Sequence, residues 1–170
     1  MALIKTVRGK TPIIHESTYL AENATVIGDV KIGRYSSIWF NTVIRGDVNS
    51  IVIGEKVNIQ DGVVVHCTFE KSVTVIGSEV SIGHNAIIHG CEISEKVLIG
   101  MGAIIMDNSV VESEVVVAAG AVVPENAVLK SGGVYAGTPA KRIKDLDSKL
   151  LEGEIERIAK NYLQYASWYR

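Results

Sequence analysis

The aliphatic residues of this chain recur at every sixth position. Stepping by six from Ile14 gives Leu20, Val26, Ile32, Ile38 and Ile44. The series resumes at Ile53 after three extra residues and at Ile76 after five. The step to Ile93 is one residue shorter than six. The series then continues by sixes to Leu129, its nineteenth aliphatic position. The residue four places after each of these aliphatic positions is usually small or β-branched, so the six-residue repeat has a second regular position.

A six-residue period fits neither the 3.6-residue period of a helix nor the alternation of an ordinary strand. It is typical of a hexapeptide β-helix, in which each hexapeptide gives one short strand and three hexapeptides give one triangular coil. Nineteen hexapeptides predict about six coils, stacked through parallel strands. An all-β sandwich would instead show period two, with turn signals every 8 to 12 residues.

The repeat stops after Leu129, at "SGGVYAGTPAKRIKD", where glycine and proline indicate a turn. Apolar residues then follow at steps of three and four, which predicts an amphipathic helix from about Ser148 to Tyr169, capped by Asp147 or Ser148. We expect one domain: a β-helix over residues 1–145 and a helix over 146–170 that packs along it. Trp39 directly follows an inward position and is expected on the outer surface, at a contact between subunits.

Composition and charge exclude several classes of function. The chain has 170 residues, 17 Lys and Arg against 19 Asp and Glu, and a net charge of −2, which argues against nucleic acid as a partner. Its start resembles no signal peptide, and no apolar run approaches a membrane span. We therefore expect a cytoplasmic protein without a membrane partner. Cys67 and Cys91 are too few for a disulfide framework.

Three of the four histidines lie between residues 63 and 90. Counted from Ile14, the sixth, ninth and twelfth hexapeptides lie on one face, and Arg45, His66 and His89 follow their inward residues. His66 and His89 should therefore sit one above the other, close enough to share a metal, with Arg45 one coil further. His84 belongs to the adjacent face.

Packing of three subunits around a threefold axis would bring the three histidines together. If three prisms surround a threefold axis, His84 of one subunit can meet His66 and His89 of the next, and closed symmetry forms the site three times. The alternative is that the histidines are solvent-facing residues with no shared role.

Four segments carry a resemblance to a known family: "RGD" (45–47), "NIQDGVVVH" (58–66), "GHNAIIHG" (83–90) and "YAGTPAK" (135–141). Together with the repeat, they resemble the γ-class carbonic anhydrases over nearly the whole chain. The H-x17-H-x4-H spacing is the specific part, because hexapeptide acyltransferases share the repeat and the G-x-P-A-K ending. The resemblance implies a left-handed β-helix and a homotrimer. It also implies zinc, with Fe²⁺ or Co²⁺ as alternatives, bound at each interface by His66, His89 and the His84 of another subunit.

The resemblance also implies an activity and further site residues. Three neutral imidazoles leave a metal one open position, where bound water is acidified to a pKa near ~7 and the hydroxide can attack CO2 to form bicarbonate. Gln60 matches the residue that orients this hydroxide. Arg45 and Asp47 match an interface ion pair, with Asp61 as a further partner of Arg45. Tyr162 matches a helix position that reaches the site, although simple helix packing is the alternative.

Two departures from the family weaken proton transfer. Val48 stands where well-known relatives have an acidic residue after the "RGD", and the loop "CTFEKS" offers only Glu70 as a candidate shuttle. The activity is therefore expected to be weak. Two other functions remain open: an acyltransferase that uses acyl-CoA, and a metal-binding trimer without catalysis.

Overall fold

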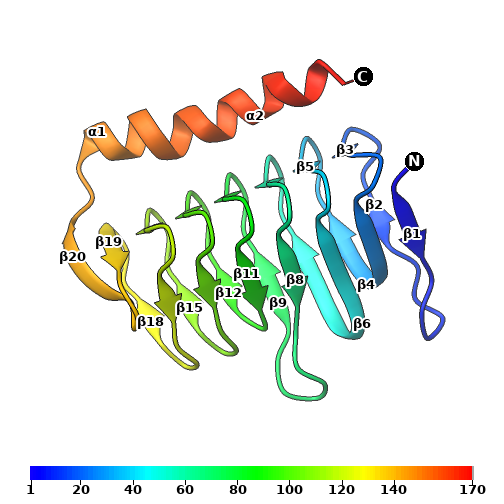
Figure 1. Cartoon of the computed structure of the whole chain (residues 1–170), viewed down its shortest axis with the longest axis horizontal. Helices are drawn as coiled ribbons and strands as arrows, with labels where there is room; N and C mark the ends of the chain where they lie inside the picture. Colours follow the sequence, from blue (N-terminus) through cyan, green and yellow to red (C-terminus); the bar gives the residue numbers. More distant parts are fainter. Residues whose placement is uncertain (170) are drawn as a thin grey trace.

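The computed structural model describes residues 1–169 and shows a left-handed parallel β-helix of about seven turns with a C-terminal helix (Figure 1). The predicted fold class is thereby confirmed. Arg170, the last residue of the predicted helical segment, lies outside the described residues.

The prism has three faces, each built of short strands that pair with the coils above and below. The first face contains β1 (Leu3–Lys5), β8 (Val64–His66), β11 (Ile87–His89), β14 (Ile104–Ile105), β17 (Val122–Val123) and the first parts of β4 (Thr25–Ile32) and β6 (Val43–Ile53). The second face contains β2 (Ile13–Ile14), β9 (Thr74–Ile76), β12 (Glu92–Ile93), β15 (Val110–Val111), β18 (Val128–Leu129) and the last parts of β4 and β6. The third face contains β3 (Tyr19–Leu20), β5 (Ser37–Ile38), β7 (Asn58–Ile59), β10 (Ser81–Ile82), β13 (Leu98–Ile99), β16 (Val116–Val117), β19 (Gly133–Ala136) and β20 (Lys141–Asp145).

The aliphatic series forms the core inside these faces. Seventeen of its nineteen positions are buried, and the other two, Ile14 and Leu20, are half-buried. The second phase fills the corners with small side chains such as Ala24, Ala86 and Ala103, each 0% exposed. Burying each large aliphatic side chain is worth about 1.5–3 kcal/mol, so a stack of this length stabilises itself without disulfides or large aromatic groups.

Two features differ from the predicted element map. The turn count exceeds six because β1 pairs with β4 and β19 pairs with β16, both outside the nineteen hexapeptides. The segment expected to be only a turn contains β19 and β20, which pair antiparallel. β20 pairs with β19 and so covers the last coil of the third face. Without it, the unpaired edge of β19 could pair with a strand of another chain.

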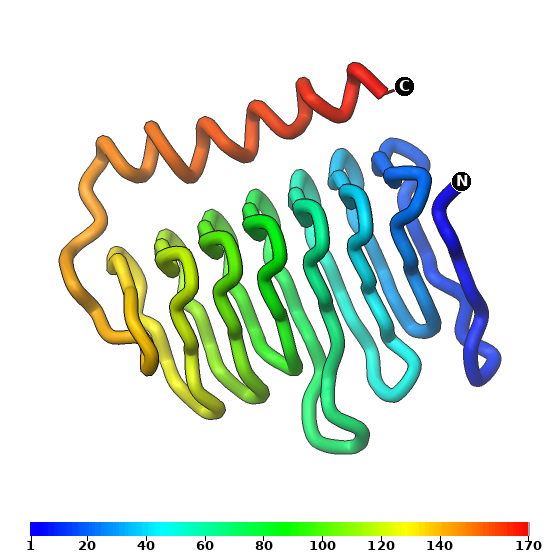
Figure 2. The backbone as a smooth tube through the Cα atoms, viewed as in Figure 1, coloured from blue at the N-terminus to red at the C-terminus, as the bar shows by residue number. Residues whose placement is uncertain are grey.

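The C-terminal helix runs back along the coils, so that both chain ends lie near the first coils (Figures 1 and 2). It consists of α1 (Ser148–Leu150), a π-helical segment η1 (Leu151–Glu156) and α2 (Arg157–Ser167). Asp147 is the cap, because its side chain accepts a hydrogen bond from the Leu150 backbone N–H at 2.8 Å. Ile155, Ala159 and Ala166 are the buried residues of η1 and α2.

The expectation that Trp39 lies on the outer surface was wrong. Its side chain is only 6% exposed, because the C-terminal helix crosses the third face above it. Tyr162 meets Trp39 edge-on with ring centroids 5.3 Å apart, and Tyr169 does so at 5.5 Å. The indole N–H donates to the Ser37 hydroxyl at 3.0 Å. Among residues 1–169, no helix is both long and apolar enough to cross a membrane.

Candidate metal centre

His66 and His89 lie on neighbouring coils of the first face. They are direct partners in the parallel pairing of β8 with β11, as the hexapeptide count predicts. Their rings are tilted with centroids 5.3 Å apart, and His66 Nδ1 lies 3.3 Å from His89 Nε2. Two ring nitrogens therefore face each other at the corner between the first and second faces.

A carboxylate stands behind each of these two rings. Asp47 Oδ1 lies 3.0 Å from His66 Nε2, and Asp107 Oδ2 lies 2.8 Å from His89 Nδ1. An ionised carboxylate only accepts hydrogen bonds, so each ring places its N–H on that outer nitrogen. The two inner nitrogens then both present lone pairs, which one metal cation could share.

The spacing of the inner nitrogens fits a metal. Two imidazole ligands at ~2.0–2.1 Å from a tetrahedral zinc ion would stand about 3.3 Å apart. Metal-binding histidines commonly donate their other ring N–H to a carboxylate, which is the arrangement seen at both rings.

Burial and hydrogen bonds set the charge states of His66 and Asp47. Burial lowers the pKa of His66 and outweighs the opposing effect of the hydrogen bond that the ring donates to Asp47, which favours the neutral ring. Burial alone would raise the pKa of Asp47, but hydrogen bonds from Arg45 and His66 hold it below its ordinary value. Arg45 Nη1 lies 2.6 Å from Asp47 Oδ2, which forms the ion pair expected from the sequence.

His84 lies at the opposite corner of the first face, in the turn after β10. Its Nδ1 is 2.9 Å from Asp61 Oδ2, and the side chain is 40% exposed. Within the chain Asp61 thus pairs with His84, and its expected pairing with Arg45 at an interface stays a prediction. The third histidine thus also lies against an aspartate, but at a different corner from the other two.

Gln60 and Tyr162 adjoin His84. All three line a cavity of about 350 Å³ between the third face and the C-terminal helix. The Gln60 amide donates to Asn58 Oδ1 at 3.0 Å, which fixes its orientation. Burial, followed by the charge of nearby Asp61, raises the pKa of Tyr162 to about 12, so this hydroxyl stays protonated.

The ligand set is incomplete within one chain. Among residues 1–169, no three His, Cys, Asp or Glu side chains gather closely enough to hold a metal ion. The first face separates the His66 and His89 corner from the His84 corner. Its outward side chains are apolar on five successive coils, namely Val43, Val64, Ile87, Ile104 and Val122.

Sequence reasoning missed Asp107, although the repeat carried a signal for it. Ile105 opens the fifteenth hexapeptide, the next in the column that holds His66 and His89, and Asp107 follows two places later. Ser72 was missed as well, and its hydroxyl contacts Asp107. Glu70 lies exposed in the loop between β8 and β9.

Comparison with known proteins places the chain among hexapeptide-repeat proteins. A family model described as "Bacterial transferase hexapeptide (six repeats)" matches residues 11–46. A hexapeptide transferase family protein from Anaplasma phagocytophilum has the same fold, with a TM-score of 0.94, 38% identity, and coverage of 99% of this chain and 98% of that one.

Two curated relatives are more specific. The "Probable carbonic anhydrase" of Methanocaldococcus jannaschii is 47% identical over 153 residues, covering 90% of this chain and 93% of the relative. "Gamma carbonic anhydrase 2, mitochondrial" of Arabidopsis thaliana is 41% identical over 163 residues, covering 92% of this chain. The chain spans only 58% of the length of that plant relative.

Proposed function

Because the chain belongs to the γ-class carbonic anhydrase family, we propose that it forms a homotrimer that binds a divalent metal at each interface and hydrates CO2 to bicarbonate. The two facing lone pairs of His66 and His89, each fixed by a carboxylate, are the observation that carries this proposal. His84 of a neighbouring subunit would supply the third nitrogen. The apolar first face between the two corners supports this packing, since subunit contacts bury such surfaces.

The metal ligands, the aspartates and Gln60 would have different roles in the proposed reaction. A metal held by three neutral imidazoles would keep one open position and acidify a water molecule there to near-neutral pKa. Asp47 and Asp107 accept from His66 and His89 and would hold these two rings in the required tautomers, while Asp61 lies 2.9 Å from Nδ1 of His84. Gln60, fixed by Asn58, would orient the reacting water or CO2.

Arg45 and Tyr162 have supporting parts. Arg45 pairs with Asp47 and so favours the ionised form of this half-buried carboxylate next to His66. Tyr162 stays protonated and can donate a hydrogen bond into the cavity that it shares with His84. Zinc is the first choice of metal, and Fe²⁺ and Co²⁺ also suit imidazole ligands. The two free cysteines are compatible with a cytoplasmic location, which stays a prediction.

Two alternative functions have specific support. The match to a transferase hexapeptide model favours acyl transfer from acyl-CoA, which requires no metal. The position of Val48 and the single carboxylate in the loop, Glu70, favour a metal-binding trimer without catalysis. Neither alternative explains why each of three histidines carries its own aspartate.

One sample distinguishes the three functions. Protein purified without oxygen is analysed for metals, and CO2 hydration is then followed by stopped flow on the same preparation. We expect about one metal per chain and measurable hydration that chelation abolishes. Metal without hydration would support the non-catalytic trimer, and acyl transfer by metal-free protein would support the transferase.

A further inference from the structure

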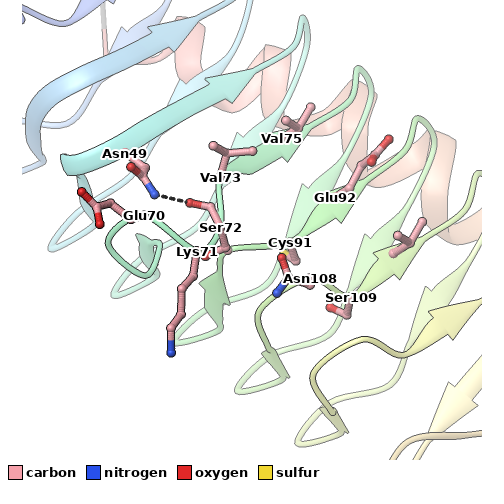
Figure 3. Close-up of a pocket in the computed structure, with 12 residues that line it drawn as sticks. Asn49, Glu70, Lys71, Ser72, Val73, Val75, Cys91, Glu92, Asn108 and Ser109 are labelled. Carbon is pink, nitrogen blue, oxygen red and sulfur yellow. Dashed lines mark hydrogen bonds between the residues drawn. The ribbon is translucent and has the colours of Figure 1, made fainter.

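The loop from Cys67 to Val73 is firmly attached to the prism at its base. Asn49 Nδ2 donates to the backbone carbonyls of both Thr68 (2.9 Å) and Ser72 (2.7 Å). The Thr68 backbone N–H donates to the Ser72 hydroxyl at 3.0 Å, which closes the loop on itself. Figure 3 shows the Asn49 contact to Ser72 at the edge of a groove of about 500 Å³ on the second face.

Ser72 reaches across the coils to Asp107. Its hydroxyl donates to Asp107 Oδ1 at 2.5 Å, while Asp107 Oδ2 accepts from His89 Nδ1 at 2.8 Å. Both carboxylate oxygens are therefore engaged, so the carboxylate cannot rotate away from the ring. Gly90 makes room for this meeting, because a Cβ there would collide with both Ser72 Oγ and Asp107 Oδ1.

We propose that Asp107 and Ser72 are positioning residues that fix His89 in its Nδ1–H tautomer, and that the Cys67–Val73 loop thereby holds Nε2 of His89 toward His66. The consequence for metal binding rests on the proposed function. The Nδ1–H tautomer of His89 does not rest on the proposed function, because it follows from the contacts within one chain.

The chemistry of the carboxylate explains why this pair is needed. Asp107 can only accept from His89, whereas an amide at this position could turn its NH2 toward the ring and favour the Nε2–H tautomer. That tautomer would place an N–H against His66 Nδ1 and remove one of the two facing lone pairs. Hydrogen bonds from Ser72 and His89 hold the pKa of Asp107 below its ordinary value, against the opposing effect of burial.

The test compares Asp107→Asn and Ser72→Ala with two matched variants. Ser72→Thr restores the hydroxyl. Ser109→Ala removes a hydroxyl from the coil that contains Asp107, one that donates to the Met106 carbonyl and not to Asp107. The tautomer of His89 is measured in metal-free, ¹⁵N-histidine-labelled protein by long-range ¹H–¹⁵N correlation, and its signals are identified by their loss in His89→Gln. Zinc affinity is measured by competition with a chelator, and folding by thermal melting.

We expect the Nδ1–H form of His89 in the wild type and in Ser109→Ala, and the Nε2–H form or a mixture in Asp107→Asn. Zinc binding should weaken about 10–100-fold in Asp107→Asn, less in Ser72→Ala, and return toward the wild-type value in Ser72→Thr. An unchanged tautomer in well-folded Asp107→Asn and Ser72→Ala would overturn the inference. If the wild type has the Nδ1–H form but binds no zinc, the inference survives and the proposed function fails.

Discussion

At the scale of residues, the proposed chemistry rests on a pair of histidine nitrogens 3.3 Å apart. The repeat count predicts the stacking of His66 on His89 because register in a β-helix follows directly from the number of hexapeptides. It could not predict which ring nitrogen faces inward. That choice depends on Asp47 and Asp107, whose side-chain directions are set by contacts between coils rather than by spacing along the chain.

Gly46, between Arg45 and Asp47, shows how tightly neighbouring coils approach. A Cβ on Gly46 would lie 2.6 Å from the Asp29 carbonyl oxygen and 3.1 Å from Val30 Cγ2. Gly46→Ala should therefore destabilise the protein by about 1–3 kcal/mol, since the backbone must shift to admit a methyl group. Gly153→Ala is the matched control, because a Cβ there meets nothing within 4 Å and alanine favours a helix.

Thermal melting of both glycine variants checks this prediction. The melting midpoint of Gly46→Ala should fall while that of Gly153→Ala stays equal or rises. Equal midpoints for Gly46→Ala and wild type would show that these coils can separate at little cost.

At the scale of elements, prediction succeeds where one residue position decides the structure. Every inward position of the hexapeptides from Val26 onward is buried, and Asp147 caps the C-terminal helix. Prediction fails for β19 and β20, because glycine and proline also occur in a short hairpin at the end of a sheet. It also fails for Trp39, since the surface that a helix covers depends on the path of the whole chain.

The contact between helix and prism gives the stability a characteristic pH dependence. An unfolded tyrosine ionises near pH ~10, whereas Tyr162 in the folded protein has a pKa of about 12. The unfolded state therefore loses its proton first, so the stability that Tyr162 contributes is complete below pH ~10 and is lost as the pH rises toward the folded pKa. Tyr162→Phe should lose less stability than the wild type over this interval.

Urea unfolding of both proteins at pH 9 and pH 11 measures the difference. Other alkaline groups, including Tyr19, are common to both proteins and cancel in the comparison. Parallel loss of stability in the two proteins would mean that Tyr162 ionises in the folded protein as it does in water.

At the scale of the whole molecule, the three faces have different surroundings. The C-terminal helix packs over the third face, and the second face carries the Cys67–Val73 loop at its edge (Figures 1 and 2). The first face presents apolar side chains between two histidine corners. Packing of the first faces around a threefold axis would bring the His84 corner of one subunit to the His66 and His89 corner of the next. The central claim is therefore that the metal site belongs to two subunits.

Subunit mixing tests this claim most directly. His84→Ala and His89→Ala proteins should each bind no zinc at the site. After unfolding and refolding together in equal amounts, an interface is complete only where a His84→Ala subunit gives His66 and His89 and a His89→Ala subunit gives His84. Random assembly then predicts recovery of about one quarter of the wild-type zinc content. No recovery in mixed trimers that are shown to form would contradict a site shared between subunits.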